Sequence, residues 1–240
     1  MGELVWGKDL SSLDENIKQL SHPDIDDIIH LQDLVIGELR DSSSYYPLSR
    51  DEVAMLLGKP GISLGTFDSE GELIGYAAAY FPGSKRDNLG LDVALSGDEL
   101  LHVAHIETGL VHPNFRGQGW QYRLYKELFK YIVAQDKYRF ILSTVACNNY
   151  PALRNSLRLN LSITGLREKY GNKLRYLLIR DLQASFNICP DTIIKCRHTD
   201  IELQRRLLGQ GYHGFDVENE SDAMVVYYGL KDLTAEGKGL

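Results

Sequence analysis

Apolar and polar positions along the first half of the chain predict a mixture of helices and short strands. Apolar residues recur at helical spacing over 24–39, and a second helix is expected after Ser49, where Ser49 and Glu52 form a capping box. Two strands joined by a turn at 69–71 follow, and residues 88–95, NLGLDVAL, are expected to form a third. This order predicts two helices followed by a strand meander.

The middle of the chain continues the alternation. An apolar strand over about 100–111 precedes an amphipathic helix over about 119–135, and a strand over 140–146 comes next. Residues 148–160 predict a loop and a helix, and the following strands form a hairpin that turns at 171–172. The elements up to residue 182 therefore predict one α/β domain.

Residues 183–240 continue with a strand, an amphipathic helix from Asp200 to Leu208 and a strand over 223–229. They could form a small cap or extend the main sheet. We interpret them as a small C-terminal α/β extension of a domain of residues 1–182, with a packed extension favoured over a role in substrate closure. The sequence leaves open whether the protein forms a homodimer.

Composition adds limits on the partners. The 240 residues are 43% hydrophobic and 25% charged, as in soluble globular proteins, and the formal net charge is -7. Because Lys and Arg form only short pairs, nucleic acid and anionic membranes are poor partners. The three cysteines show no disulfide framework or metal spacing, and no leader or membrane span is evident. These features predict a cytoplasmic protein.

A glycine loop between a strand and a helix carries the clearest chemistry. Residues 111–121 read VHPNFRGQGWQ. Glycine lets backbone N–H groups approach an anion, and the start of a helix adds partial positive charge. Gly117 and Gly119 lack the third glycine of a dinucleotide fingerprint and the Gly-Lys-Ser/Thr of a P-loop. The loop therefore predicts a phosphate site of a different kind.

This segment, Val-x-Pro-x-Phe-Arg-Gly-x-Gly, resembles the acetyl-CoA-binding motif of the GNAT N-acetyltransferase superfamily, and the order of elements over about 20–182 is similar as well. The resemblance implies an α/β (α+β) fold with a mixed, mostly antiparallel central sheet flanked by helices. It also implies a pyrophosphate cradle made of Arg116, Gly117, Gln118, Gly119, Trp120 and Gln121. Gln121 stands where that family usually has Gly or Ala.

The resemblance implies an acyltransferase that moves an acetyl group from acetyl-CoA to a primary amine, on a small molecule or a peptide, by direct attack in a ternary complex. The arm of acetyl-CoA would lie between the strands at 100–111 and 140–146. Its implied contacts are the backbone of Gly109, Leu110 and Val111 and the side chain of Asn149. No metal is expected.

Two residues of the strand over 100–111 are candidate bases. Strand alternation places His105, Glu107, Gly109 and Val111 on one face, so Glu107 is the first choice for general base and His105 the second. A salt-bridged strand carboxylate and a hydrogen-bonded core histidine are equally good interpretations. His102 and His105 would point to opposite faces of a strand, which argues against a metal.

A general acid and the acceptor contacts are less directly indicated. Ser156 stands where many members of the family have a tyrosine that acts as general acid. Tyr150, which lies close in sequence, is the candidate to take that role here. Tyr45 and Tyr46, between the first two helices, are candidate substrate-binding residues. Cys147 is interpreted as a small apolar residue at the end of a strand, in preference to a nucleophile that forms an acyl-enzyme.

Two other classes of function stay open on the sequence. One is a non-catalytic module that binds or senses acyl-CoA, which the serine at position 156 would suit. The other is a nucleotide-binding α/β protein whose glycine loop holds a different diphosphate. Glu107 and the segment from Pro113 to Arg116 favour the enzyme over both.

Overall fold

The computed structural model describes residues 13–39, 41–220 and 223–232, so that most of the N-terminal segment used to look for a leader lies outside it. The helices are α1 (Ile25–Gly37), α2 (Arg50–Leu56), α3 (Trp120–Ala134), α4 (Tyr150–Arg158) and α5 (Ile201–Gly209). The strands are β1 (Ile17–Gln19), β2 (Gly61–Phe67), β3 (Leu73–Tyr80), β4 (Val103–Val111), β5 (Phe140–Ala146), β6 (Ser162–Lys169), β7 (Lys173–Asp181), β8 (Ile194–Arg197), β9 (His213–Asn219) and β10 (Met224–Gly229). No described helix is long and apolar enough to cross a bilayer.

The described strands form one ten-stranded sheet in the order β1-β2-β3-β4-β5-β7-β6-β9-β10-β8. Neighbouring strands run antiparallel except β4 and β5, which are parallel. Helix α3 joins these two strands, as a parallel crossover requires. The mixed, mostly antiparallel sheet expected from the sequence is confirmed.

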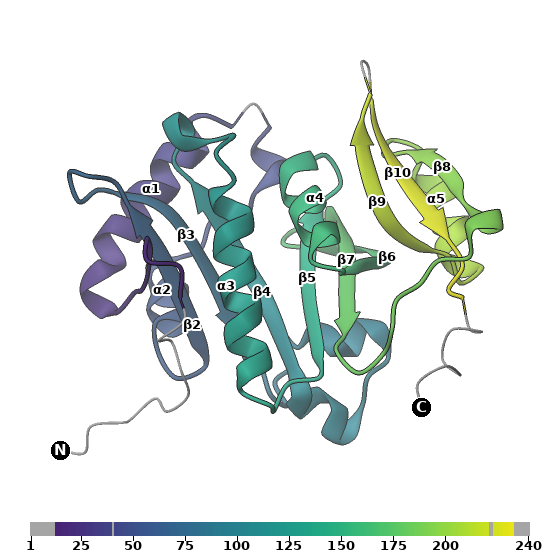
Figure 1. The fold of residues 1–240 in the computed structure, drawn as a ribbon, viewed down its shortest axis with the longest axis horizontal. Coiled ribbons are helices and arrows are strands. Elements are labelled where there is room, and N and C mark those ends of the chain that lie inside the picture. The colour runs from purple at the N-terminus through teal and green to yellow at the C-terminus, as the bar shows by residue number, and fades with distance from the viewer. Residues whose placement is uncertain (1–12, 40, 221–222, 233–240) are drawn as a thin grey trace.

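Helices cover both faces of the sheet. Helices α3 and α4 lie on the face toward the viewer in Figure 1, and α1 and α2 lie on the other. Strand β3 shows how both faces are filled, because Ala77 and Ala79 pack with α3 whereas Tyr76 and Tyr80 pack with α1 and α2. The small side chains of Ala77 and Ala79 let α3 pack closely against β3 and the neighbouring strand β4.

The segment expected to be a third strand of the meander is instead a short 3₁₀ helix, Leu89–Val93. The side chain of Asn88 accepts a hydrogen bond from the backbone N–H of Gly90 at 2.8 Å, and Ala94 ends the helix with a left-handed φ of 62°. A second 3₁₀ helix, Gly97–His102, means that β4 begins only at Val103. Local side-chain capping overrides the apolar pattern here.

The C-terminal residues extend the sheet. Strand β9 joins β6 at the pair Ile163 and Gly214, where a Cβ on Gly214 would lie 2.7 Å from the Ile163 side chain. The fully buried Gln204 of α5 accepts hydrogen bonds from the hydroxyls of Tyr176 and Tyr228, both at 2.8 Å. This amide therefore ties β7 to β10 through α5.

Candidate active site

The site begins where β4 and β5 separate. The two strands pair only from Val103 with Phe140 to Ile106 with Ser143, although β4 continues to Val111. At the last pair, the Ser143 hydroxyl donates a hydrogen bond to the Ile106 carbonyl at 2.8 Å. Beyond this pair the two strands no longer pair with each other.

A β-bulge in β4 sets the direction of the side chains at the opening. Ala79 pairs with Ile106 and Ala78 with Thr108, so Glu107 is the extra residue of the bulge. Ala104 and Ile106 pack with α3 before the bulge. The extra residue reverses this alternation for the rest of the strand.

The prediction that His105, Glu107, Gly109 and Val111 share one face of β4 is therefore wrong for the residues after Glu107. Leu110 packs with α1 and α2, and a Cβ on Gly109 would lie 2.5 Å from the ring of Tyr125 on α3. Gly109 and, by alternation, Val111 thus face α3, whereas His105 lies on the opposite face. Glycine at position 109 lets α3 pack directly over the opened end of β4.

The glycine loop lies at the start of α3. Gly117 and Gly119 have φ angles of 80° and 82°, and a Cβ on either would meet nothing within 4 Å. No side chain caps the helix, and Arg116 and Gln118 are exposed. The loop thus presents uncapped backbone N–H groups and a cation to the solvent, as an anion site requires.

Two further side chains at this helix start have specific partners. The Trp120 ring stacks under the Arg123 guanidinium, 4.1 Å from its centroid, and Arg123 pairs with Asp14 at 2.6 Å. The Gln121 amide donates to the Gly109 carbonyl at 3.1 Å and accepts from Asn155 of α4 at 2.8 Å. Gln121 therefore links β4 to α4 across the opening.

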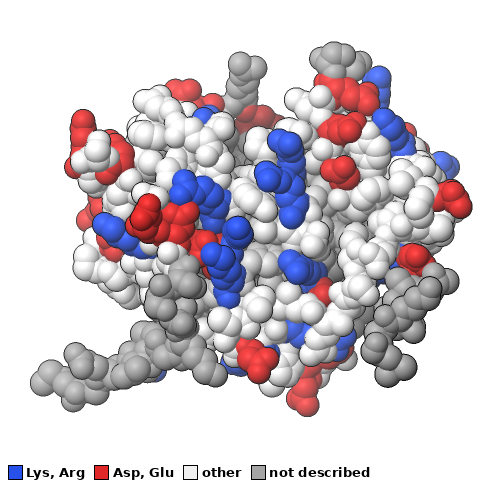
Figure 2. Space-filling view, in the orientation of Figure 1, with Lys and Arg blue, Asp and Glu red and all other residues white. Residues whose placement is uncertain are grey.

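Basic residues gather over this side of the molecule despite the acidic total. Figure 2 shows Lys and Arg side chains over α3 and α4, with acidic side chains mainly toward the periphery. The exposed basic residues of the loop and the two helices are Arg116, Lys126, Lys130, Arg154 and Arg158. The fold thus builds a basic surface from charges that are dispersed in the sequence.

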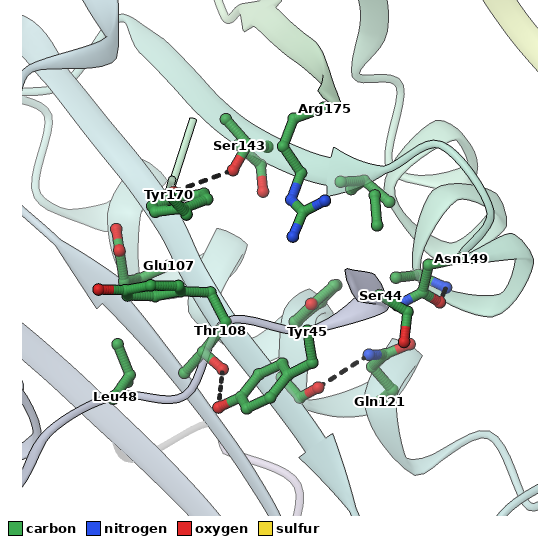
Figure 3. Close-up of a pocket in the computed structure, with 17 residues that line it drawn as sticks. Ser44, Tyr45, Leu48, Glu107, Thr108, Gln121, Ser143, Asn149, Tyr170 and Arg175 are labelled. Carbon is green, nitrogen blue, oxygen red and sulfur yellow. Dashed lines mark hydrogen bonds between the residues drawn. The ribbon is translucent and has the colours of Figure 1, made fainter. Parts of the chain in front are cut away.

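A cavity opens at the separated ends of β4 and β5 (Figure 3). It is lined by Ser44, Tyr45, Tyr46, Leu48, Glu107, Thr108, Gly109, Gln121, Tyr125, Ser143, Thr144, Val145, Ala146, Asn149, Ala152, Tyr170 and Arg175. The lining thus joins the loop between α1 and α2, the strand opening, the starts of α3 and α4, and the hairpin of β6 and β7.

Glu107 lines this cavity and His105 lies behind it. His105 is 2% exposed, and its Nε2 accepts the backbone N–H of Leu89 at 3.1 Å. This contact places the ring proton on Nδ1, which lies 3.7 Å from Oε2 of Glu107. Glu107 is thus the carboxylate that meets the cavity, and His105 supplies a dipole directed at it.

The loop between α1 and α2 is held over the cavity by a buried amide. Gln32 of α1 accepts from the Tyr45 hydroxyl at 2.9 Å and bonds both backbone groups of Leu48. Burial raises the pKa of Tyr45 to about 12. Tyr46 is 41% exposed and stacks on Tyr170 with ring centroids 4.8 Å apart. Both tyrosines named from the sequence therefore line the cavity.

Tyr170 was missed by the sequence analysis. It stands at the tip of the hairpin of β6 and β7 with a left-handed φ of 53°, and its hydroxyl lies 3.1 Å from Oγ1 of Thr144 on β5. Burial and the nearby Glu107 carboxylate raise the pKa of this phenol above its usual value. The tyrosine is therefore protonated at neutral pH.

The residues named at the end of β5 and in α4 divide between cavity and core. Asn149 lines the cavity and caps α4, accepting the Ala152 N–H at 3.2 Å. Tyr150 packs against the core outside the lining, and the buried Ser156 donates back to the Ala152 carbonyl at 3.0 Å. Burial raises the pKa of Cys147 to about 11, which keeps it a poorly nucleophilic thiol at neutral pH.

Arg175 of β7 is another lining residue that was not predicted from the sequence, and the only charged one of these among the described residues. Tyr170 and Arg175 both lie in KYGNKLR, residues 169–175, and the aromatic and basic residues around this hairpin turn were the sequence signal that could have indicated them. Their place in the site follows from the pairing of β7 with β5, which sets Arg175 opposite Ala146. Among the described residues, no group of three metal-ligating side chains is present.

Comparison with known protein families agrees with this geometry. A family model described as "Acetyltransferase (GNAT) family" matches residues 28–156, more than half of the chain. A search of curated proteins found no match.

Solved structures share the fold. The Arabidopsis thaliana NAA60 in complex with acetyl-CoA has a TM-score of 0.55 at 18% identity, covering 70% of this chain and 98% of its own. The ribosomal-protein-S18-alanine N-acetyltransferase from Escherichia coli has 0.52 at 14% identity, covering 70% and 94%. An N-acetyltransferase from Staphylococcus aureus Mu50 has 0.52 at 19%, covering 70% and 98%. The expected fold class is confirmed.

Proposed function

Because the chain belongs to the GNAT acetyltransferase family and is an acyltransferase, we propose that it transfers an acetyl group from acetyl-CoA to a primary amine by direct attack in a ternary complex. The observation that carries this proposal is the cavity at the opened ends of β4 and β5. Glu107 stands on one wall, and Gln121, whose amide donates to the Gly109 carbonyl, stands on the other. An amine and a thioester can therefore meet inside it.

The residues present fit acetyl-CoA. The uncapped start of α3, the open glycines and the exposed Arg116 suit its pyrophosphate, and the basic surface over α3 and α4 suits its further phosphate. The pantetheine arm would enter between β4 and β5, beside Gly109, Leu110, Val111 and Asn149. When bound, acetyl-CoA supplies an acyl group activated as a thioester.

Glu107 is the proposed general base. An amine is protonated at neutral pH, so a proton must leave the nitrogen before its lone pair can attack the acyl carbon. Glu107 takes this proton, directly or through water, and the freed lone pair then attacks the acyl carbon. The C–N bond forms while the C–S bond breaks with its electron pair moving to sulfur, and the second proton on the nitrogen of the adduct passes to water to leave the neutral amide. His105 holds Nδ1–H toward Glu107 and acts as a positioning residue in this proposal.

Tyr170 is the proposed general acid. Its phenol is protonated at neutral pH and lies beside Thr144 just beyond the last β4–β5 pair, so it can return a proton to the departing sulfur. Tyr150, the candidate from the sequence, lies outside the cavity lining and has weaker support. Mutation of each tyrosine in turn can show which of the two acts as the general acid.

Calorimetric titration with acetyl-CoA, CoA and ATP tests the proposal. We expect dissociation constants on the order of micromolar for both CoA species, no binding of ATP, and CoA release when primary amines are added. Binding of ATP alone would support the nucleotide-binding alternative. Tight binding of acetyl-CoA with no turnover on any amine would support a sensing module instead.

A further inference from the structure

Arg175 is a buried cation on the wall of the cavity. It is 4% exposed, and its guanidinium points into the cavity in Figure 3. Its position opposite Ala146 in the pairing of β7 with β5 fixes it at the mouth of the strand opening. A long charged side chain is almost never buried without a partner, so its bonding is informative.

The hydrogen bonds that Arg175 makes within the protein are to neutral groups. Nη1 donates to the carbonyl of Leu174 at 3.1 Å and Nη2 to the carbonyl of Ser43 at 2.8 Å, with the Tyr170 ring centroid 5.8 Å away. Among the described residues, no carboxylate lies within ion-pair distance of this guanidinium. Asp41, the nearby acid, is bonded to Ser43 and Asn148.

Burial lowers the pKa of the Arg175 guanidinium, which means that the protein around it destabilises the charged form. An arginine keeps its proton nonetheless, and its fork of N–H donors matches the two oxygens of a carboxylate. The arrangement is therefore complementary to an anion that arrives with a ligand.

We propose that the acceptor is a free amino acid, whose carboxylate binds Arg175 and whose amine faces Glu107. This inference rests on the proposed acetyl transfer and names its substrate class. The two charged groups of an amino acid match the two charges of the cavity, one carboxylate on β4 and one guanidinium on β7. An amine without an acid group would leave the buried guanidinium unpaired.

The enclosure of the cavity also favours a small acceptor. Tyr46 stacks on Tyr170 over the site, and Gln32 and Arg175 both hold the loop of residues 43–48 in place. The cavity is small, about 90 Å³. It suits a small molecule better than a folded protein surface.

The test compares matched acceptors at saturating acetyl-CoA, measured by CoA release. Each standard amino acid is paired with its carboxamide, which keeps the amine and removes the negative charge. We expect kcat/KM for the best amino acid to exceed that for its amide by roughly 10- to 100-fold, as for loss of a charge-assisted hydrogen bond. In Arg175→Gln this ratio should fall toward one.

Because Arg175 also holds Ser43, a matched control must loosen the same loop from its other end. Gln32→Ala breaks the bonds to Tyr45 and Leu48 without touching Arg175. Both substrates should lose rate together in that variant, and the ratio should survive. A structural role alone would make Arg175→Gln behave in the same way, which would overturn the proposal.

The other outcomes are also decisive. Preference for amides, for amines without an acid group or for amino phosphates over amino acids would reject the substrate class while leaving acetyl transfer intact. Absence of acetyl-CoA binding, or of turnover on every amine, would instead reject the proposed function. The two failures are therefore distinguishable.

Discussion

The two walls of the cavity are built in different ways. The wall proposed to hold acetyl-CoA includes Gly109 and Gln121, the two ends of one continuous segment that finishes β4, forms the glycine loop outside the cavity and starts α3. The wall proposed to hold the acceptor, called the acceptor wall below, combines residues 44–46 and 48, Glu107 and Thr108 at the bulge, Thr144 of β5, and the hairpin residues Tyr170 and Arg175. One wall is thus a local motif, and the other exists only after folding.

The walls differ in electrostatics as well. The glycine loop is exposed and has basic residues around it, so it suits the phosphates of a ligand that reaches the solvent. The acceptor wall is buried, and burial raises the pKa values of Tyr45 and Tyr170 and lowers that of Arg175. Charges act more strongly in such a desolvated place. Mutations on the two walls should therefore affect different constants.

The largest expected effect is on turnover at the acceptor wall. Glu107→Gln keeps the shape of the side chain but removes the proposed base. We expect kcat to fall roughly 100- to 10,000-fold, with the dissociation constant of acetyl-CoA unchanged. Steady-state CoA release and calorimetry on the same sample measure the two quantities.

Glu52→Gln is the matched control for this loss. Glu52 lies nearby in the capping box of α2, outside the cavity lining, and glutamine can keep its bond to Ser49. Its kcat should stay within about twofold of the wild type, as for most surface substitutions. A wild-type kcat in Glu107→Gln would remove Glu107 as the base.

The next largest effect is on binding at the cofactor wall. Gly119→Asp and Gly119→Asn place side chains of nearly equal size at a left-handed φ of 82°, which both residues tolerate better than most. Only the aspartate brings a negative charge toward the pyrophosphate. We expect acetyl-CoA to bind roughly 10-fold more weakly to Gly119→Asp than to Gly119→Asn. Equal affinities by calorimetry would contradict the cradle.

The contrast between the walls also explains what could be predicted from the sequence. Arg116, Gly117 and Gly119 could be proposed from the sequence because a phosphate loop needs these residue types close together in the chain. Tyr170 and Arg175 could not, since only the register of β7 against β5 brings them to the site. The sequence order likewise indicated the sheet and its helices.

The bulge at Glu107 marks a second limit of sequence reasoning. Strict alternation put Gly109 on the face of His105, and one inserted residue reversed it. A bulge leaves no signature in a single apolar strand, because it is selected by the partner strand. Capping by Asn88 similarly replaced an expected strand with a 3₁₀ helix.

A smaller effect should distinguish the two candidate acids. Tyr170→Phe removes the hydroxyl beside Thr144 while the stack on Tyr46 is kept. We expect kcat to fall about 10-fold, a modest loss because thiols are acidic enough to leave with little assistance. Tyr150→Phe should change kcat by less than about twofold. A larger loss of CoA release in Tyr150→Phe than in Tyr170→Phe would identify Tyr150 as the general acid. The acid would then not be part of the acceptor wall.

The smallest effect concerns Gln121, which stands where the family usually has Gly or Ala and links β4 to α4. The Gln121 amide occupies the Gly109 carbonyl, where the arm of acetyl-CoA is proposed to bind, so the ligand must displace this hydrogen bond. Gln121→Ala should therefore bind acetyl-CoA roughly two- to fivefold more tightly by calorimetry. Asn155→Ala keeps the bond to Gly109 and should have a smaller effect. Weaker binding in Gln121→Ala would show instead that this glutamine holds the ligand itself, which would make the cofactor wall depend on one side chain as well as on its backbone.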